Sequence, residues 1–155
     1  MVLSRQRLST GYCRFEMNLS YKLERVVSQH WRGQPVLVFC NSRKAASSTA
    51  TVLARAGQAG QWLVGGAARQ PELQATAARL EDPRLRELAV QHGLAWHHAG
   101  LSSQDRRTVE QMFSAGLLGV LACTSTLALG VNLPAATVVI KSTQQMVTGC
   151  WREVG

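Results

Sequence analysis

The sequence predicts an α/β fold in which a parallel sheet carries helices on both faces. Short apolar runs of strand length alternate along the 155 residues with segments whose apolar positions recur at helical spacing. Most of these runs hold few polar side chains, as is typical of parallel strands buried on both faces. Hydrophobic residues make up 46% of the chain and charged residues 17%, which is enough to fill one core. The pattern therefore favours a single α/β domain.

The first part of the chain is expected to contain one helix and one strand. Residues 1–17 show no clear period, and we expect them to form a poorly ordered lead-in. Helical spacing begins at Ser20, a residue type that caps helices, and continues to about Trp31. The Gly and Pro of segment 32–35 end this helix. Five consecutive apolar residues, 36–40, then predict the first strand.

The later elements follow from the same periodicities. A polar turn over 41–44 leads into an alanine-rich helix over 45–56. Residues 57–70 contain four glycines and no strong period, and we expect them to form a surface connection. The remaining predicted elements, in chain order, are helices over 71–80 and 83–91, a strand over 94–97, a helix from 103 to about 116, a strand over 119–123, a helical turn over 125–129 and a strand over 137–141.

The charge of the chain indicates a polyanionic partner. The net charge of +8 comes from 17 basic and 9 acidic residues, and 14 of the basic residues are arginine. Residues 1–55 hold nine basic and two acidic residues, so the excess is almost entirely N-terminal. A guanidinium group can hold two phosphate oxygens at once, which suits phosphate recognition. The alternative is a solvated basic face that binds no ligand.

The cysteines and the start of the chain indicate an intracellular reducing compartment. Four cysteines occur, none at CxxC spacing, and no apolar stretch of signal-peptide length follows the basic start. Cys40 and Cys123 lie in apolar runs and are expected to be buried thiols. The uncharged window between Glu110 and Lys141 could span a bilayer, but hydroxyl residues, glycines and Pro134 break it up. We therefore expect no membrane partner.

The turns that follow the predicted strands are the candidate binding sites, because ligands of open parallel sheets bind beyond the carboxyl ends of the strands. The turn after the first predicted strand offers a phosphate the hydroxyl of Ser42, a helix N-terminus and the cations of Arg43 and Lys44. After His97, Gly100 lets a backbone approach a ligand closely, and Arg106 and Arg107 could hold a phosphate. Thr124 and the two hydroxyl residues that follow the strand over 119–123 could bind one as well. The alternative is that these residues only cap helices or form ion pairs. In that interpretation Arg106 and Arg107 pair with Asp105 and Glu110.

Two further patterns stand in the same turns. Adjacent His97 and His98 could suggest a metal site, but neighbouring strand residues point to opposite faces and no Cys, Asp or Glu stands at ligand spacing. We interpret both as hydrogen-bonded core or rim residues, and expect no metal. In segment 124–134, three hydroxyl residues precede Gly130 and Asn132, whose amide can bind a sugar hydroxyl or a base edge. A capped turn is the alternative there.

Three ordered segments resemble helicase motifs. Residues 36–44 (Val-Leu-Val-Phe-Cys-Asn-Ser-Arg-Lys), residues 97–106 (beginning His-His-Ala-Gly-Leu) and residues 124–135 (Thr-Ser-Thr-Leu-Ala-Leu-Gly-Val-Asn-Leu-Pro-Ala) are similar to motifs IV, IVa and V of superfamily-two DExH helicases of the Ski-type group. The resemblance covers about residues 17–145. Within the group it is greatest to the meiotic crossover DNA helicases.

The resemblance implies that residues 18–145 are the second RecA-like lobe, the C-terminal lobe, of an ATP-dependent 3′-to-5′ DNA helicase. The residues that it places against the nucleic-acid backbone are Ser42, Arg43, Gly100, Arg106 and Thr124. Gly130 and Asn132 would lie at the interlobe cleft near the ATP sugar. The implied cofactors are ATP and Mg²⁺, the implied partners are single-stranded DNA and a first RecA-like lobe in cis, and the implied location is the nucleus.

Departures from the family pattern limit what the chain is expected to do alone. The sequence contains no GxxxxGK[ST] loop and no acidic Asp-Glu box, and residues 146–155 read as a truncated tail that stops before motif VI. We therefore expect a single incomplete motor lobe, with no catalytic residue of its own and no ATP hydrolysis by itself. The alternative is a basic module that binds single-stranded nucleic acid without any role for ATP.

Overall fold

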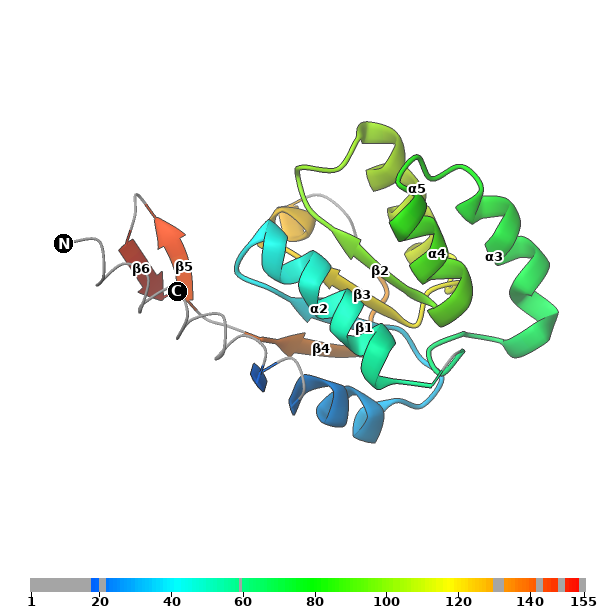
Figure 1. Ribbon diagram of the computed structural model, residues 1–155, viewed down its shortest axis with the longest axis horizontal. Helices are drawn as coiled ribbons and strands as arrows, with labels where there is room; N and C mark the ends of the chain where they lie inside the picture. Colours follow the sequence, from blue (N-terminus) through cyan, green and yellow to red (C-terminus); the bar gives the residue numbers. More distant parts are fainter. Residues whose placement is uncertain are drawn as a thin grey trace.

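A parallel sheet of four short strands forms the centre of the molecule. The computed structural model describes residues 18–19, 22–58, 60–129, 133–141, 144–147 and 150–153, so the expected lead-in lies outside the described residues. The strands are β1 (Val36–Phe39), β2 (Leu94–His97), β3 (Val120–Cys123) and β4 (Thr137–Ile140). Their order is β2-β3-β1-β4, and every neighbouring pair is parallel (Figure 1). The predicted parallel α/β sheet is confirmed.

Helices cover both faces of this sheet. The main ones are α2 (Arg43–Ala56), α4 (Pro83–His92) and α5 (Ser103–Ser114). The chain crosses the sheet in one direction from β1 to β2 and in the other from β2 to β3. Because such connections are right-handed, α2 and α4 lie on one face and α5 lies on the other. Figure 1 shows α2 in front of the sheet, and α2 contacts β2 and β3.

The start of α2 lies two residues earlier than predicted. Ser42 has an extended backbone and its Oγ accepts a hydrogen bond from the Ala45 amide at 3.0 Å, which makes it the N-cap. Arg43 and Lys44 therefore belong to the first helical turn and not to the preceding loop. Ser102, in the turn after β2, caps α5 in the same way, because its Oγ accepts a hydrogen bond from the Asp105 amide at 3.1 Å.

The segment between α2 and α3 (Gln70–Ala77) is packed more deeply than we expected. We expected a surface connection over 57–70, but Trp62 is fully buried and Leu63 forms an isolated bridge with Leu118. A methyl group on Gly93 or on Gly119 would clash with the Trp62 carbonyl, so only glycine allows this close approach. The burial thus depends on glycines that are distant in the sequence.

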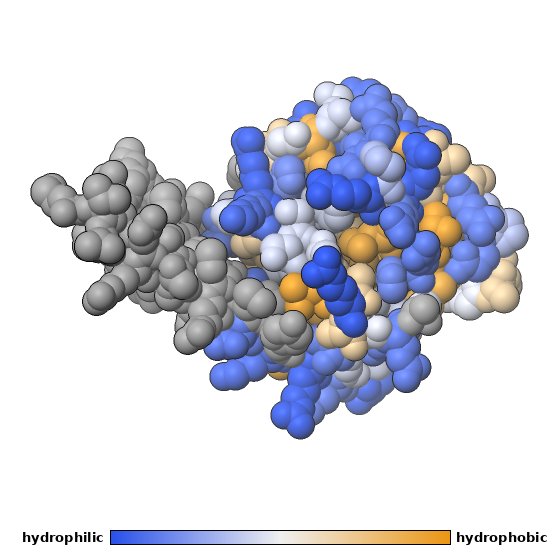
Figure 2. Space-filling model, in the orientation of Figure 1, coloured by the Kyte–Doolittle hydropathy of each residue, from blue (hydrophilic) through white to orange (hydrophobic). Residues whose placement is uncertain are grey.

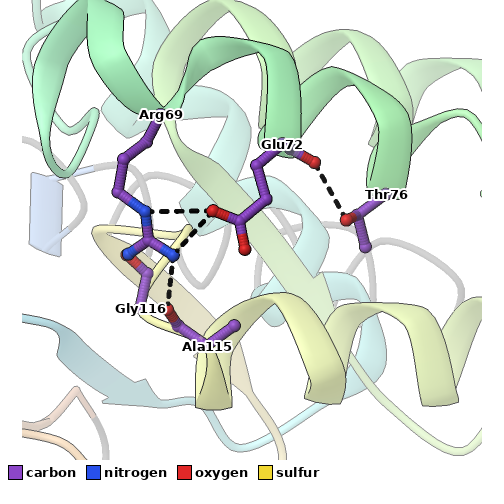
Figure 3. A network of polar contacts seen from close by, with 5 residues as sticks. All are labelled: Arg69, Glu72, Thr76, Ala115 and Gly116. Carbon is purple, nitrogen blue, oxygen red and sulfur yellow. Dashed lines mark hydrogen bonds and ion pairs between the residues drawn. The ribbon is translucent and has the colours of Figure 1, made fainter.

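Arg69 joins this connection to the end of α5. It is the last residue of the short helix η1 (Gly66–Arg69), and its guanidinium donates to the carbonyl oxygens of Ala115 at 3.0 Å and Gly116 at 3.2 Å. The same group pairs with Glu72 Oε2 at 3.0 Å (Figure 3). A cation at the carbonyl end of a helix satisfies groups that have no partner within the helix and interacts favourably with its dipole.

Two further features concern the last third of the chain. Strands β5 (Gln144–Val147) and β6 (Cys150–Glu153) pair as an antiparallel hairpin, which the sequence did not lead us to expect. The uncharged window between Glu110 and Lys141 holds the end of α5, β3, η2 (Ser125–Leu129) and β4. Within the described ranges, no helix has the length and apolar character needed to cross a membrane.

Candidate nucleic-acid interface

The turns that follow β1, β2 and β3 lie at one edge of the sheet. The last residues of the three strands are in register, with Phe39 and His97 both opposite Cys123. Backbone hydrogen bonds continue this alignment past the strands, from Cys40 N to Cys123 O at 2.7 Å and from Thr124 N to His97 O at 3.2 Å. The predicted site residues in these turns therefore share the carboxyl edge. Figure 2 shows hydrophilic side chains projecting from this side of the coloured body.

Ser42 and Arg43 stand at the start of α2. The Ser42 hydroxyl accepts from the Ala45 amide, so its own O–H remains able to donate to a ligand. Arg43 is exposed and occupies the first helical position, where the helix dipole favours an anion. Both residues thus stand at the start of the helix, where Ser42 acts as the cap that the alternative interpretation gave it.

The turn after β2 approaches Arg43. Gly100 is exposed, and a methyl group on its Cα would lie 3.4 Å from Arg43 Nη1 and 3.0 Å from the His98 ring. The Gly100 amide donates to His98 Nδ1 at 3.0 Å, and the Leu101 amide donates to the His98 carbonyl at 3.2 Å. The fold therefore brings Arg43 and Gly100 together, two predicted site residues that are 57 positions apart in the sequence.

Arg106 lies in the first part of α5 and is half-buried. Its Nη2 donates to Ser103 Oγ at 3.4 Å, while its Nε is buried and has no hydrogen-bond partner in the described part of the chain. The alternative in which Asp105 and Glu110 neutralise the two arginines of this helix is wrong. The Asp105 carboxylate accepts from the amides of Glu81 at 2.6 Å and Asp82 at 3.2 Å, and thereby fixes the start of α4.

Glu110 is held by His97 instead. His97 Nε2 lies 2.8 Å from Glu110 Oε1, and the imidazole is buried between β2 and α5. Burial lowers the pKa of His97 below the ordinary histidine value, although the Glu110 carboxylate opposes this effect. The interpretation of His97 as a hydrogen-bonded core residue is confirmed. His98 is the half-buried rim residue, one position beyond the end of β2.

Thr124 is half-buried at the end of β3. Its Oγ1 lies 2.9 Å from Thr126 Oγ1, and its carbonyl accepts from the Leu127 amide at 3.2 Å in the first turn of η2. This gives a pair of hydroxyls beside a helical turn, the arrangement expected of a phosphate contact. Gly130 and Asn132, the residues expected near the ATP sugar, lie outside the described residues.

The two cysteines of the central strands behave as expected. Cys40 and Cys123 are both buried thiols, and burial raises the pKa of Cys123 to about 12, which disfavours the reactive thiolate form. Thr49 of α2 was not among the residues predicted from the sequence, although its hydroxyl accepts from Lys141 Nζ at 3.0 Å and from Cys40 Sγ at 3.6 Å. A hydroxyl residue in an otherwise alanine-rich helix was the sequence signal that could have identified it.

Among the described residues, no three His, Cys, Asp or Glu side chains cluster as metal ligands.

Comparison with known proteins identifies the class of this lobe. Residues 72–146 match the helicase conserved C-terminal domain. The fold and this match together define a RecA-like lobe, so this chain carries the C-terminal lobe found in such helicases. The predicted helicase C-terminal lobe of the DExH group is confirmed.

Particular relatives are similar over most of the chain. The probable ATP-dependent DNA helicase HFM1 of Xenopus tropicalis is 38% identical over 140 residues, which is 90% of this chain and 10% of that protein. The ATP-dependent DNA helicase MER3 of Saccharomyces cerevisiae is 38% identical over 123 residues, 79% of this chain and 9% of that protein. The pre-mRNA-splicing factor brr2 of Schizosaccharomyces pombe is 40% identical over 134 residues, 83% of this chain and 6% of that protein. The chain thus spans about a tenth or less of these relatives.

Proposed function

We propose that this lobe grips the backbone of single-stranded DNA at the carboxyl edge of its sheet, as the second half of an ATP-dependent DNA helicase motor. The observation that carries the proposal is the meeting of Arg43 and Gly100 beside the turn that holds Thr124. Hydroxyls, an exposed guanidinium and a helix start at one edge can bind phosphates without reading bases. The relatives named as ATP-dependent DNA helicases support DNA as the substrate.

The proposal assigns ATP and Mg²⁺ to a cleft between this lobe and a first RecA-like lobe. Gly130 and Asn132 would contribute to the cleft, and a first lobe would supply the phosphate-binding loop that this sequence lacks. ATP would close the two lobes and hydrolysis would reopen them, so that alternating grip moves the strand. The similarity to the HFM1 and MER3 DNA helicases supports a nuclear location, which we propose with this function.

A binding experiment separates this proposal from a basic module that binds through its N-terminal third. We expect Thr124→Ala and Arg106→Ala each to weaken binding of labelled single-stranded DNA roughly threefold to tenfold. Removal of residues 1–16 should have a smaller effect. Arg107→Ala is the matched control, because this exposed neighbour on α5 carries the same charge. If only the truncation weakens binding, the carboxyl edge is not the binding site. Measuring the binding of single-stranded RNA in the same assay tests whether DNA or RNA is the preferred nucleic acid.

Turnover gives an independent test. We expect the chain alone to show no ATP hydrolysis with or without DNA, because the sequence has neither the phosphate-binding loop nor the acidic box that positions Mg²⁺. The measurement is phosphate release in the presence of Mg²⁺ and single-stranded DNA. DNA-stimulated phosphate release by the purified chain would contradict the description of it as an incomplete motor lobe.

A further inference from the structure

His98 occupies the space between the two turns that meet at the proposed interface. A methyl group on Gly100 would lie 3.0 Å from both Nδ1 and Cε1 of the His98 ring, and Arg43 Nη1 flanks the same Cα. The ring is half-buried, whereas Arg43 and Gly100 are exposed. Gly100 therefore leaves room for an imidazole that lies beside the exposed guanidinium.

The hydrogen bond to Gly100 fixes which nitrogen of His98 carries the proton. The Gly100 amide donates to Nδ1 at 3.0 Å, and a nitrogen that accepts a hydrogen bond has a free lone pair. In a neutral ring the proton is then on Nε2. Burial and the nearby Arg43 charge both lower the pKa of His98, so the ring is neutral at physiological pH.

The Nε2–H group is available to a ligand. No residue in the described part of the chain bonds to His98 Nε2, and this atom is not among the buried polar atoms that lack a partner, although His97 Nδ1 is. Nε2 therefore reaches solvent at the carboxyl edge. The Gly100 amide, in contrast, is already engaged by the ring and is not free to bind a phosphate.

We propose that His98 is a further nucleic-acid contact, in which the ring donates its Nε2–H to a backbone phosphate oxygen beside Arg43. This inference rests on the proposed function and deepens it. It assigns Gly100 a different part in the site, because the glycine admits the ring and orients it through its amide, while the imidazole and the guanidinium make the contacts. A neutral N–H donor beside an arginine holds a phosphate in place without adding charge.

Two substitutions separate the nitrogens of the ring. His98→Asn puts an amide oxygen near the position of Nδ1 and retains an acceptor for Gly100, but removes the donor at Nε2. His98→Gln puts an amide N–H near the position of Nε2 and restores the donor, but loses the acceptor. We expect His98→Asn to raise the Kd for labelled single-stranded DNA about threefold to tenfold, and His98→Gln to stay within about twofold of the wild type. His30→Asn, at an exposed histidine of the helical segment 22–30, is the matched control and should not change the Kd.

The outcomes distinguish the inference from the function on which it rests. If Arg106→Ala and Thr124→Ala weaken binding and His98→Asn does not, the inference is overturned and the proposed function stands. If His98→Asn binds normally while His98→Gln loses both affinity and thermal stability, His98 only shapes the turn, and the inference is again wrong. If the wild-type chain does not bind single-stranded DNA at all, both proposals fail.

Nuclear magnetic resonance of the imidazole nitrogens tests the same point without any substitution. At pH 7.5 the inference predicts a proton on Nε2 and none on Nδ1 of His98, with the Nε2–H signal shifting as single-stranded DNA is added. A proton on Nδ1, or an Nε2–H signal that stays unchanged while the DNA binds, would overturn it.

Discussion

At the scale of single residues, His97 connects the sheet to α5 through one hydrogen bond. Its Nε2 lies 2.8 Å from Glu110 Oε1, and its backbone carbonyl accepts from the Thr124 amide. The side chain thus lies in the core while the backbone supports a residue of the proposed interface. Because β2 ends with this buried ring, a change in its charge should affect the stability of the fold.

The lowered pKa of His97 predicts how stability depends on pH. Burial favours the neutral ring in the folded chain, so the unfolded chain binds a proton at higher pH. The stabilisation is complete above pH ~6.5, the ordinary histidine pKa, and is lost as the pH falls below this value. His97→Gln should reduce the slope of unfolding free energy between pH 7.5 and 5.5, by at most about 1.4 kcal/mol per pH unit. Urea unfolding at several pH values measures this; equal slopes for the two proteins would show that His97 does not titrate on unfolding.

At the scale of elements, the contact between Arg69 and the end of α5 is a tertiary helix cap. We expect Arg69→Ala to lower the free energy of unfolding by about 1 kcal/mol, because the carbonyls of Ala115 and Gly116 lose their donors at a partly exposed position. Glu72→Ala is the control, since it removes only a surface ion pair and should cost less than about 0.5 kcal/mol. Chemical denaturation gives both values, and equal losses would mean that the ion pair and not the cap is stabilising.

The elements also show what the sequence could and could not predict. Each sheet strand was predicted to within a residue or so at each end, because all four form apolar runs that stand out from their surroundings. Strands β1, β2 and β3 are almost entirely buried, as expected of central parallel strands, whereas the edge strand β4 leaves Val138 and Ile140 exposed. The burial of Trp62 was not predicted, because it depends on close approach to Gly93 and Gly119, far along the chain. The hairpin of β5 and β6 was missed for a related reason, since neither strand has a marked apolar run.

The sequence was enough to predict where the proposed interface lies, but not which of its side chains contact one another. Parallel strands share their carboxyl edge, so convergence of the three turns followed from the fold class alone. The contact between Arg43 and the Gly100 turn depends on the orientation of side chains that no periodicity encodes. The same holds for Asp105, which was expected to meet an arginine and instead binds two backbone amides at the start of α4.

At the scale of the whole molecule, the excess of positive charge lies in a different part of the chain from most of the proposed nucleic-acid contacts. The net charge of +8 is concentrated in residues 1–55, whereas the proposed contacts come from three turns between Ser42 and Thr124. Positive charge anywhere on the surface raises the affinity for a polyanion and makes it dependent on salt. Salt dependence by itself therefore does not locate the binding site, and a comparison at constant net charge is needed.

Arg43 and Arg55 provide that comparison. Both are exposed on α2 and carry the same charge, but they are separated by twelve residues, about 18 Å along the helix, so that Arg43 lies at the carboxyl edge and Arg55 at the opposite edge. The most direct measurement is the Kd for single-stranded DNA of Arg43→Ala and Arg55→Ala over a series of salt concentrations. We predict that Arg43→Ala weakens binding about threefold to tenfold and reduces the salt slope by about 0.7, while Arg55→Ala changes both much less. Equal losses from the two variants would contradict a nucleic-acid grip at the carboxyl edge.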